Sequence, residues 1–101
     1  MSGSIIGPET VCRKLVISGA VQGVTFRAST AREAMKYPGL RGHVRNLPNG
    51  DVEVLIQGPA SSVEAMIEWC HHGPPQARVE NVTSTECRVD PAMGYFVARG
   101  D

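Results

Sequence analysis

Hydrophobic positions recur with two different periods along this chain. Near the N-terminus, residues 12–18 are dense in apolar side chains, as is typical of a central β-strand. Further on, Phe26, Thr30 and Ala34 recur at every fourth position in a segment rich in alanine, which favours a helix. We therefore expect a strand over residues 12–18 and a helix over residues 25–36.

A β-hairpin is predicted in the middle of the chain. Residues 42–47 form a candidate strand, and residues 51–57 alternate valine and isoleucine with other side chains, as expected of the return strand. Between them lies Asn49-Gly50, which favours a type I′ turn because both central residues of that turn need a positive φ.

The second half of the chain predicts another helix and two more strands. The helix is indicated by four apolar residues at the i, i+3, i+4 and i+7 spacing: Val63, Met66, Ile67 and Cys70. Residues 78–88 and 95–99 are expected to be strands. Thr25 is the expected cap of the first helix, and Ser61 and Glu64 have the spacing of a capping box for the second.

The predicted order, β-α-β-β-α-β followed by a short terminal β-strand, is that of the ferredoxin-like split βαβ fold. We expect an α+β sandwich: an antiparallel sheet with both helices on one face and a short extra C-terminal strand. A length of 101 residues suits one domain. We place it at residues 11–101, after a flexible N-terminal tail over residues 1–10.

Composition narrows the classes of function. Apolar residues make up 42% of the chain and charged residues 20%, which is ordinary for a globular protein. An aromatic content of 5% argues against a base-stacking platform for nucleic acid. No apolar stretch approaches the ~20 residues that span a bilayer, and the N-terminus does not resemble a secretory signal. We therefore expect a cytoplasmic protein without nucleic-acid or membrane partners, and we also expect a monomer.

The formal net charge of zero conceals an asymmetry. Through residue 50 there are seven basic and two acidic residues, whereas from residue 51 onward there are three basic and eight acidic ones. A basic half suggests an anionic ligand. The alternative is that folding mixes the two halves and the asymmetry has no consequence.

The cysteines and histidines predict neither a metal site nor a cofactor. The cysteines are Cys12, Cys70 and Cys87. They contain no C-x-x-C pair, so reduced thiols are the default expectation and one disulfide bridge stays open. The spacing of His43, His71 and His72 is not the i, i+4 spacing of a helical zinc pair.

The predicted topology brings two segments to one edge of the sheet. The first two strands run in the same direction, so the loop Gly19–Val24 and Asn46 should converge there. A glycine-containing loop that enters a helix N-terminus presents backbone N–H groups suited to phosphate. Arg27, in the first helical turn, has a guanidinium that can bind phosphate through two bonds. The alternatives are a plain turn with a solvated Arg27, and an Asn46 that only begins the hairpin turn.

Two motifs strongly resemble the acylphosphatase family: GAVQGVTFR at residues 19–27 and GHVRNLPNGDVEV at residues 42–54. The resemblance covers about residues 12–99. This chain departs from the family pattern at His43, where an aromatic residue, often Trp, is usual. It also departs at Asn49-Gly50, which replaces the commoner Asp-Gly and keeps the same turn chemistry.

The resemblance implies metal-free hydrolysis of a small acyl phosphate, such as acetyl, carbamoyl or glyceroyl phosphate, to a carboxylate and inorganic phosphate. It implies that Arg27 binds the phosphate and that Asn46 orients the nucleophilic water. Gly19 and Thr30 match positions that support the phosphate loop. The loop's backbone amides would come from Val21, Gln22, Gly23, Val24, Thr25 and Phe26.

Two readings without catalysis stay open. One is a phosphate-binding accessory domain that resembles acylphosphatase, of the kind fused to hydrogenase-maturation carbamoyltransferases. The end of the chain at Asp101 argues against it. The other is an RNA-binding ferredoxin-like module, which needs exposed aromatic residues on its central strands, and the predicted strands over residues 12–18 and 51–57 offer none.

Overall fold

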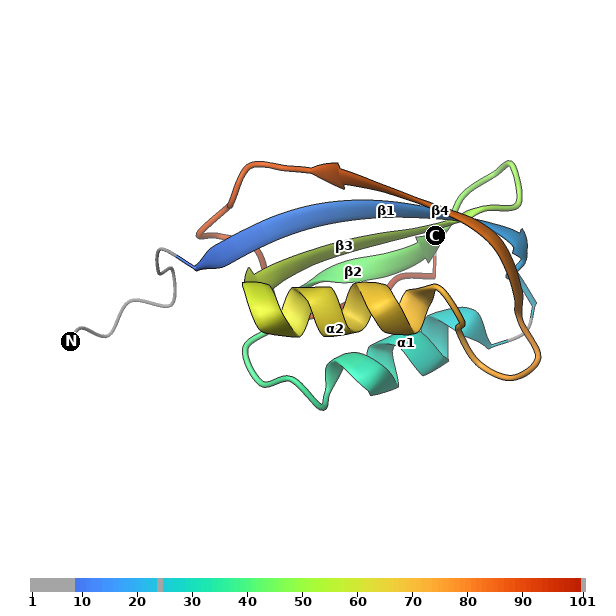
Figure 1. Ribbon diagram of the computed structural model, residues 1–101, viewed down its shortest axis with the longest axis horizontal. Helices are drawn as coiled ribbons and strands as arrows, with labels where there is room; N and C mark the ends of the chain where they lie inside the picture. The colour runs from blue at the N-terminus through green and yellow to red at the C-terminus, as the bar shows by residue number, and fades with distance from the viewer. Residues whose placement is uncertain (1–8, 24, 101) are drawn as a thin grey trace.

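Two helices cover one face of a five-stranded β-sheet in the computed structural model, which describes residues 9–23 and 25–100 (Figure 1). Most of the predicted tail, together with Val24 and Asp101, lies outside the described residues. The elements are β1 (Thr10–Ala20), α1 (Phe26–Ala34), β2 (Arg41–Asn46), β3 (Val52–Pro59), α2 (Ala60–Cys70), β4 (Arg78–Glu86) and β5 (Val97–Ala98). The predicted order of elements is confirmed.

The strands are arranged in the order β4-β1-β3-β2-β5. The strand β3 is antiparallel to both β1 and β2, so these two run in the same direction. Val52, at the start of β3, pairs with Ile17 on one side and with Asn46 on the other. The C-terminal ends of β1 and β2 therefore meet at one edge of the sheet, as predicted. The short β5 adds to β2 in parallel.

The hydrophobic core lies between the sheet and the two helices. The predicted inner face of α1 is confirmed, because Phe26, Thr30 and Ala34 are all buried. The predicted stripe of α2 is confirmed by the buried Val63, Met66 and Cys70, and Ile67, its fourth member, is partly buried against the core. The strands contribute Leu15, Ile17, Val44, Val52, Val54 and Ile56, none of which is exposed to solvent. Burying a side chain of this size contributes roughly 1.5–3 kcal/mol.

Neither predicted cap forms its side-chain hydrogen bond, although Thr25 does occupy the N-cap position of α1. Thr25 precedes α1 with φ 60° and ψ 24°, a left-handed conformation, and makes no side-chain cap hydrogen bond. An N-cap residue normally has extended dihedral angles, so the conformation of Thr25 prevents capping. The helix α2 begins at Ala60, directly after Pro59, which places Ser61 inside the first turn instead of at the cap. The first helix is also shorter than predicted and ends at Ala34.

The predicted type I′ turn between β2 and β3 is wrong as well. Gly50 has φ 99°, but Asn49 does not have a positive φ. The N–H of Gly50 donates to the carbonyl of Leu47 at 3.1 Å, and the N–H of Leu47 donates to the carbonyl of Asp51 at 2.8 Å. This is a three-residue loop of the kind in which a type I turn precedes a left-handed residue. Pro48 favours it because its ring fixes φ near −65° at the first central position.

The last two strands are shorter than predicted. The strand β4 ends at Glu86, and β5 comprises only Val97 and Ala98. Tyr95, the predicted start of the last strand, forms an isolated bridge with Arg41. The segment between these strands is instead held by hydrogen bonds to β2 and β3, among them two between Gln57 and Asp90 and one from the N–H of Gly42 to the carbonyl of Gly94.

Candidate active site

A pocket of about 300 Å³ lies at the sheet edge where β1 and β2 end. It brings together Arg27 and Asn46, which are 19 positions apart in the chain. The residues that line it are Val21, Gly23, Thr25, Phe26, Arg27, Ala28, Asn46, Ala98, Arg99 and Gly100. The predicted convergence of the loop with the end of the second strand is therefore observed.

Arg27 is half-buried in the first turn of α1, which contains no acidic residue. A cation there opposes the helix dipole at a cost of roughly 0.3–1 kcal/mol, and an anion bound nearby would remove that cost. The guanidinium donates from Nη1 to the carbonyl oxygen of Arg99 at 2.5 Å. One such bond positions the group and leaves further N–H donors of the guanidinium for a ligand.

Asn46 is the last residue of β2 and is half-buried. Alternation along the strand places it on the same face as Gly42 and Val44, which are buried. This is the face that the helices cover, so Asn46 lies beside the N-terminus of α1 and lines the pocket. Its amide can both donate and accept hydrogen bonds.

The loop that enters α1 has an unusual backbone. Gly23 has φ 77° and Thr25 has φ 60°, so both flanks of residue 24 are left-handed. For threonine this conformation costs about 1–3 kcal/mol, and such strain concentrates at ligand-binding sites. Successive N–H groups in a turn of mixed handedness can form a concave anion site. The strained Thr25 is thus a structural reason to assign anion binding to this loop.

Gly19 and Thr30 do not line the pocket, but they stabilise the two elements beside it, the end of β1 and the start of α1. Gly19 has φ 126°, and a Cβ added there would lie 2.1 Å from the carbonyl oxygen of Arg78. A glycine is therefore needed where β1 approaches β4, directly before the loop. Thr30 is fully buried, and its hydroxyl donates to the carbonyl of Phe26 at 2.7 Å. The ring of Phe26 packs at 5.8 Å from that of Trp69, which fixes the start of α1 against α2.

The side chain of Gln22 makes a contact that the sequence pattern did not indicate. It leaves the loop and donates from Nε2 to the carbonyl oxygens of Leu47 and Asp51, each at 2.8 Å. These two carbonyls flank the β2–β3 turn. The side chain of Gln22 therefore links the loop to the hairpin turn, which begins directly after Asn46.

Three pocket residues come from the C-terminal segment and were not among the predicted site residues. Ala98, Arg99 and Gly100 reach the pocket because β5 pairs in parallel with β2, and the N–H of Arg99 donates to the carbonyl of Val44 at 2.8 Å. The sequence signals only a short last strand that ends in a basic residue. It carries no signal for the edge of the sheet to which that strand adds.

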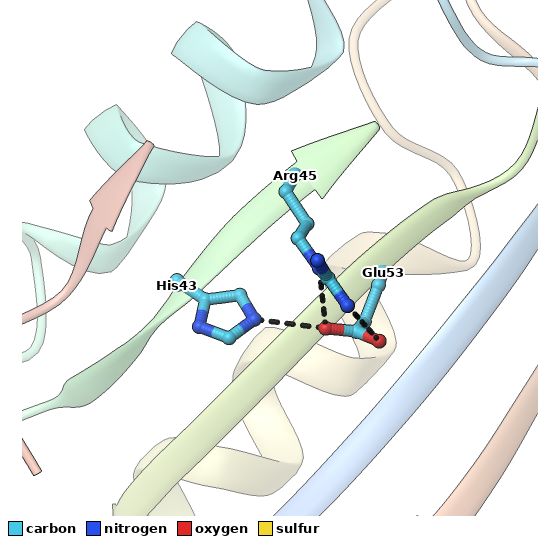
Figure 2. A network of polar contacts seen from close by, with 3 residues as sticks. All are labelled: His43, Arg45 and Glu53. Carbon is cyan, nitrogen blue, oxygen red and sulfur yellow. Dashed lines mark hydrogen bonds and ion pairs between the residues drawn. The ribbon is translucent and has the colours of Figure 1, made fainter. Parts of the chain in front are cut away.

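A charged network lies on the other face of β2 (Figure 2). Glu53 accepts hydrogen bonds from His43 Nε2 at 2.8 Å and from Arg45 Nε at 3.0 Å. Burial raises the pKa of Glu53, but the hydrogen bonds and positive charges of Arg45 and His43 outweigh that effect and lower it. The network joins β2 to β3 at the residues next to Asn46. His43, the departure from the family pattern, thus has a partner of its own.

Residues 9–23 and 25–100 contain no group of three or more His, Cys, Asp or Glu side chains that could hold a metal ion. No helix among them is long and apolar enough to cross a membrane.

The order of elements and the sheet topology define a ferredoxin-like α+β fold. The family model for acylphosphatase matches residues 13–98. A curated acylphosphatase from Nitrosococcus oceani is 53% identical over 88 residues, which cover 87% of this chain and 97% of the relative. The solved structure of an acylphosphatase from Coxiella burnetii superimposes with a TM-score of 0.83 at 40% identity, over 90% of this chain and 94% of that chain.

The chain therefore belongs to the acylphosphatase family, and it is an enzyme of the hydrolase class that the family name denotes. A larger protein also contains a similar domain. Full-length HypF, solved in a phosphate- and nucleotide-bound form, matches with a TM-score of 0.79 at 26% identity, and the match covers 94% of this chain but 12% of that chain.

Proposed function

We propose that this chain hydrolyses the anhydride bond between carboxylate and phosphate in small acyl phosphates, releasing a carboxylate and inorganic phosphate. Family membership supports the reaction class. The observation that carries the residue assignment is the pocket, in which Arg27, Asn46 and the left-handed loop line one cavity.

Arg27 and the loop backbone hold the phosphoryl group in this proposal. The guanidinium matches two phosphoryl oxygens through parallel N–H bonds, and the helix N-terminus adds backbone donors and a favourable dipole. Charge on the transferring phosphoryl group spreads over its three equatorial oxygens. Preorganised donors aimed at those oxygens stabilise the transition state, which is the largest contribution that such a site makes.

Asn46 holds the water for in-line attack. The water oxygen bonds to phosphorus on the side opposite the carboxylate, while the bond between phosphorus and the carboxylate oxygen breaks. The departing carboxylate is a weak base with a pKa of about 4, so it leaves without protonation. The described pocket lining contains no Asp, Glu or His side chain, and the proton of the water passes to a phosphoryl oxygen. This step needs no metal.

A phosphate-binding domain without turnover is the alternative that one observation favours. The match to HypF shows that a domain of this shape also exists as a small part of a larger protein. The same pocket would then bind phosphate or a phosphoryl group without hydrolysing it.

The test is the hydrolysis of benzoyl phosphate by the purified chain with EDTA present. We expect turnover well above the spontaneous rate, and we expect chelator to leave it unchanged. Loss of activity in EDTA with recovery on adding Mg²⁺ or Zn²⁺ would refute the metal-free mechanism. A folded chain that binds inorganic phosphate but does not exceed the spontaneous rate would favour the binding domain.

A further inference from the structure

Cys12 and Cys87 meet near the N-terminal end of β1, whereas the pocket lies beyond the other end of that strand. Their Sγ atoms lie 2.7 Å apart although 75 positions separate them in the chain. The β1–β4 ladder explains the contact, because Arg13 pairs with Glu86 and the N–H of Cys87 donates to the carbonyl of Cys12 at 3.0 Å. Cys87 directly follows β4, so the two cysteines are neighbours where the antiparallel β1–β4 ladder ends.

Their surroundings allow only one of the two sulfurs to meet a solute. Cys12 is 3% exposed, whereas Cys87 is half-buried. The third cysteine, Cys70, is fully buried in the core on α2. Its position in the core makes Cys70 an internal reference for a thiol that should not react.

We propose that Cys12 and Cys87 are a site of reversible oxidation, where a small-molecule disulfide such as glutathione disulfide converts the two thiols into an intramolecular disulfide. Cross-strand neighbours in an antiparallel pair have Cα atoms about 4.5–5.5 Å apart, inside the range of about 4.4–6.8 Å that a disulfide requires. The spacing of the two chains at this point therefore suits a disulfide, and the two sulfur atoms already lie side by side.

The reaction has two steps. The sulfur of Cys87 loses its proton and attacks one sulfur of glutathione disulfide, which breaks that disulfide bond and releases one glutathione. The sulfur of Cys12 then loses its proton and attacks Cys87 in the mixed disulfide, which releases the second glutathione. The protein loses two electrons and two protons, and the two glutathione thiols receive them.

The order of attack follows from the environment of Cys12. Burial, together with its hydrogen bond to Cys87, raises the pKa of the Cys12 thiol to about 12. A protonated, buried thiol is a poor first nucleophile toward a solute. In the second step the target sulfur is held beside it, so proximity compensates for the low fraction of thiolate.

The disulfide would stabilise the edge of the sheet that β4 forms. It would link this edge strand to β1 and fix the start of the C-terminal segment. In that segment the N–H of Asp90 donates to Oε1 of Gln57 at 2.8 Å, and Nε2 of Gln57 donates to the carbonyl of Asp90 at 2.9 Å. A disulfide that closes so long a loop should raise Tm by roughly 10 °C or more. The pocket lies at the other end of β1, so activity should stay within about twofold. The proposal does not depend on the catalytic mechanism.

The experiment incubates the wild-type chain and Cys70→Ser with glutathione disulfide and measures intact mass, linked peptides and Tm. We expect a loss of about 2 Da in both proteins, one cross-link between the peptides that contain Cys12 and Cys87, and a higher Tm, all reversed by dithiothreitol. Wild-type protein alone suffices if Cys70→Ser does not fold.

Cys12→Ser and Cys87→Ser are the matched variants. Cys12→Ser should keep a stable glutathione adduct on Cys87 with no rise in Tm, and Cys87→Ser should not react. The proposal is overturned if wild-type protein keeps the adduct, if all three thiols stay open to alkylation after unfolding, or if the bridge includes Cys70 or joins two molecules.

Discussion

The side-chain amide of Gln22 lies 2.8 Å from the carbonyl oxygen of Leu47, the residue that follows Asn46. A second bond of the same length reaches the carbonyl of Asp51 across the turn. The side chain of Gln22 thus links the loop proposed to hold phosphate to the turn that follows Asn46, the residue proposed to hold water. This link adds to the sheet, in which Val52 pairs with both Ile17 and Asn46.

Replacing Gln22 with alanine should separate positioning from binding. We expect kcat for benzoyl phosphate to fall by roughly 10- to 100-fold, because a displacement of about 1 Å in a reacting group costs that much. Inhibition by inorganic phosphate should change little, since Arg27 and the loop amides stay in place. Gln76→Ala, at an exposed position, is the matched control and should behave like wild type. A wild-type kcat in Gln22→Ala would show that the link does not position Asn46.

Replacing Arg27 tests the phosphate contact. We expect Arg27→Ala to lose at least about 10³-fold in kcat/KM, and Arg27→Lys not to recover it, because an ammonium cannot form two parallel bonds to phosphate. The fold should survive, since this arginine opposes the helix dipole. Arg32→Ala, in the last turn of the same helix, is the control. If Arg27→Ala keeps more than about a tenth of wild-type activity, Arg27 has no part in the mechanism.

Much of this arrangement is predictable from the sequence because it follows from local periodicity. The positions of Phe26, Thr30 and Ala34 on one helical face, and the alternation in β3, define the core without any tertiary information. Strand direction then brings Asn46 to the N-terminus of α1. The resemblance to a family adds the roles of Arg27 and Asn46, which spacing alone leaves open.

The remaining features depend on tertiary contacts. The left-handed Thr25 is set by the loop, which overrides the residue's preference for capping. The fixed φ of Pro48 overrides the turn preference of Asn49-Gly50. The parallel addition of β5, which brings Arg99 to the pocket, joins segments that are far apart in sequence, and no local pattern reports it.

Two glycine substitutions should differ because of their surroundings. Gly19 and Gly23 both have positive φ, but a Cβ at Gly19 meets the carbonyl oxygen of Arg78 at 2.1 Å, while a Cβ at Gly23 meets no atom of the described chain within 4 Å. Gly23→Ala should cost about 1–2 kcal/mol of unfolding free energy from backbone strain. Gly19→Ala should cost at least about 2 kcal/mol more. Equal values from urea unfolding would mean that β1 and β4 can separate without penalty.

The Glu53 network predicts a pH-dependent stability. The pKa of Glu53 is lowered from 4.5 in the folded chain, so the ionised carboxylate contributes stability above about pH 4.5. This contribution is lost as the pH falls through the pKa of Glu53 in the folded state. Glu53→Gln should therefore reduce the unfolding free energy at pH 7 by about 1–3 kcal/mol, and the difference from wild type should shrink at pH 3. Urea titrations at both pH values measure this. A difference that is the same at both would exclude ionisation of Glu53 as its source.

The most direct test of the mechanism is Asn46→Ala, with kcat and inhibition by inorganic phosphate measured on the same folded protein. Asn49→Ala, in the adjacent turn, is the control for a purely structural effect. The water-positioning role predicts a fall in kcat of roughly 10²- to 10³-fold with unchanged phosphate inhibition. An unchanged kcat, as expected for Asn49→Ala, or a parallel loss of phosphate affinity would contradict it.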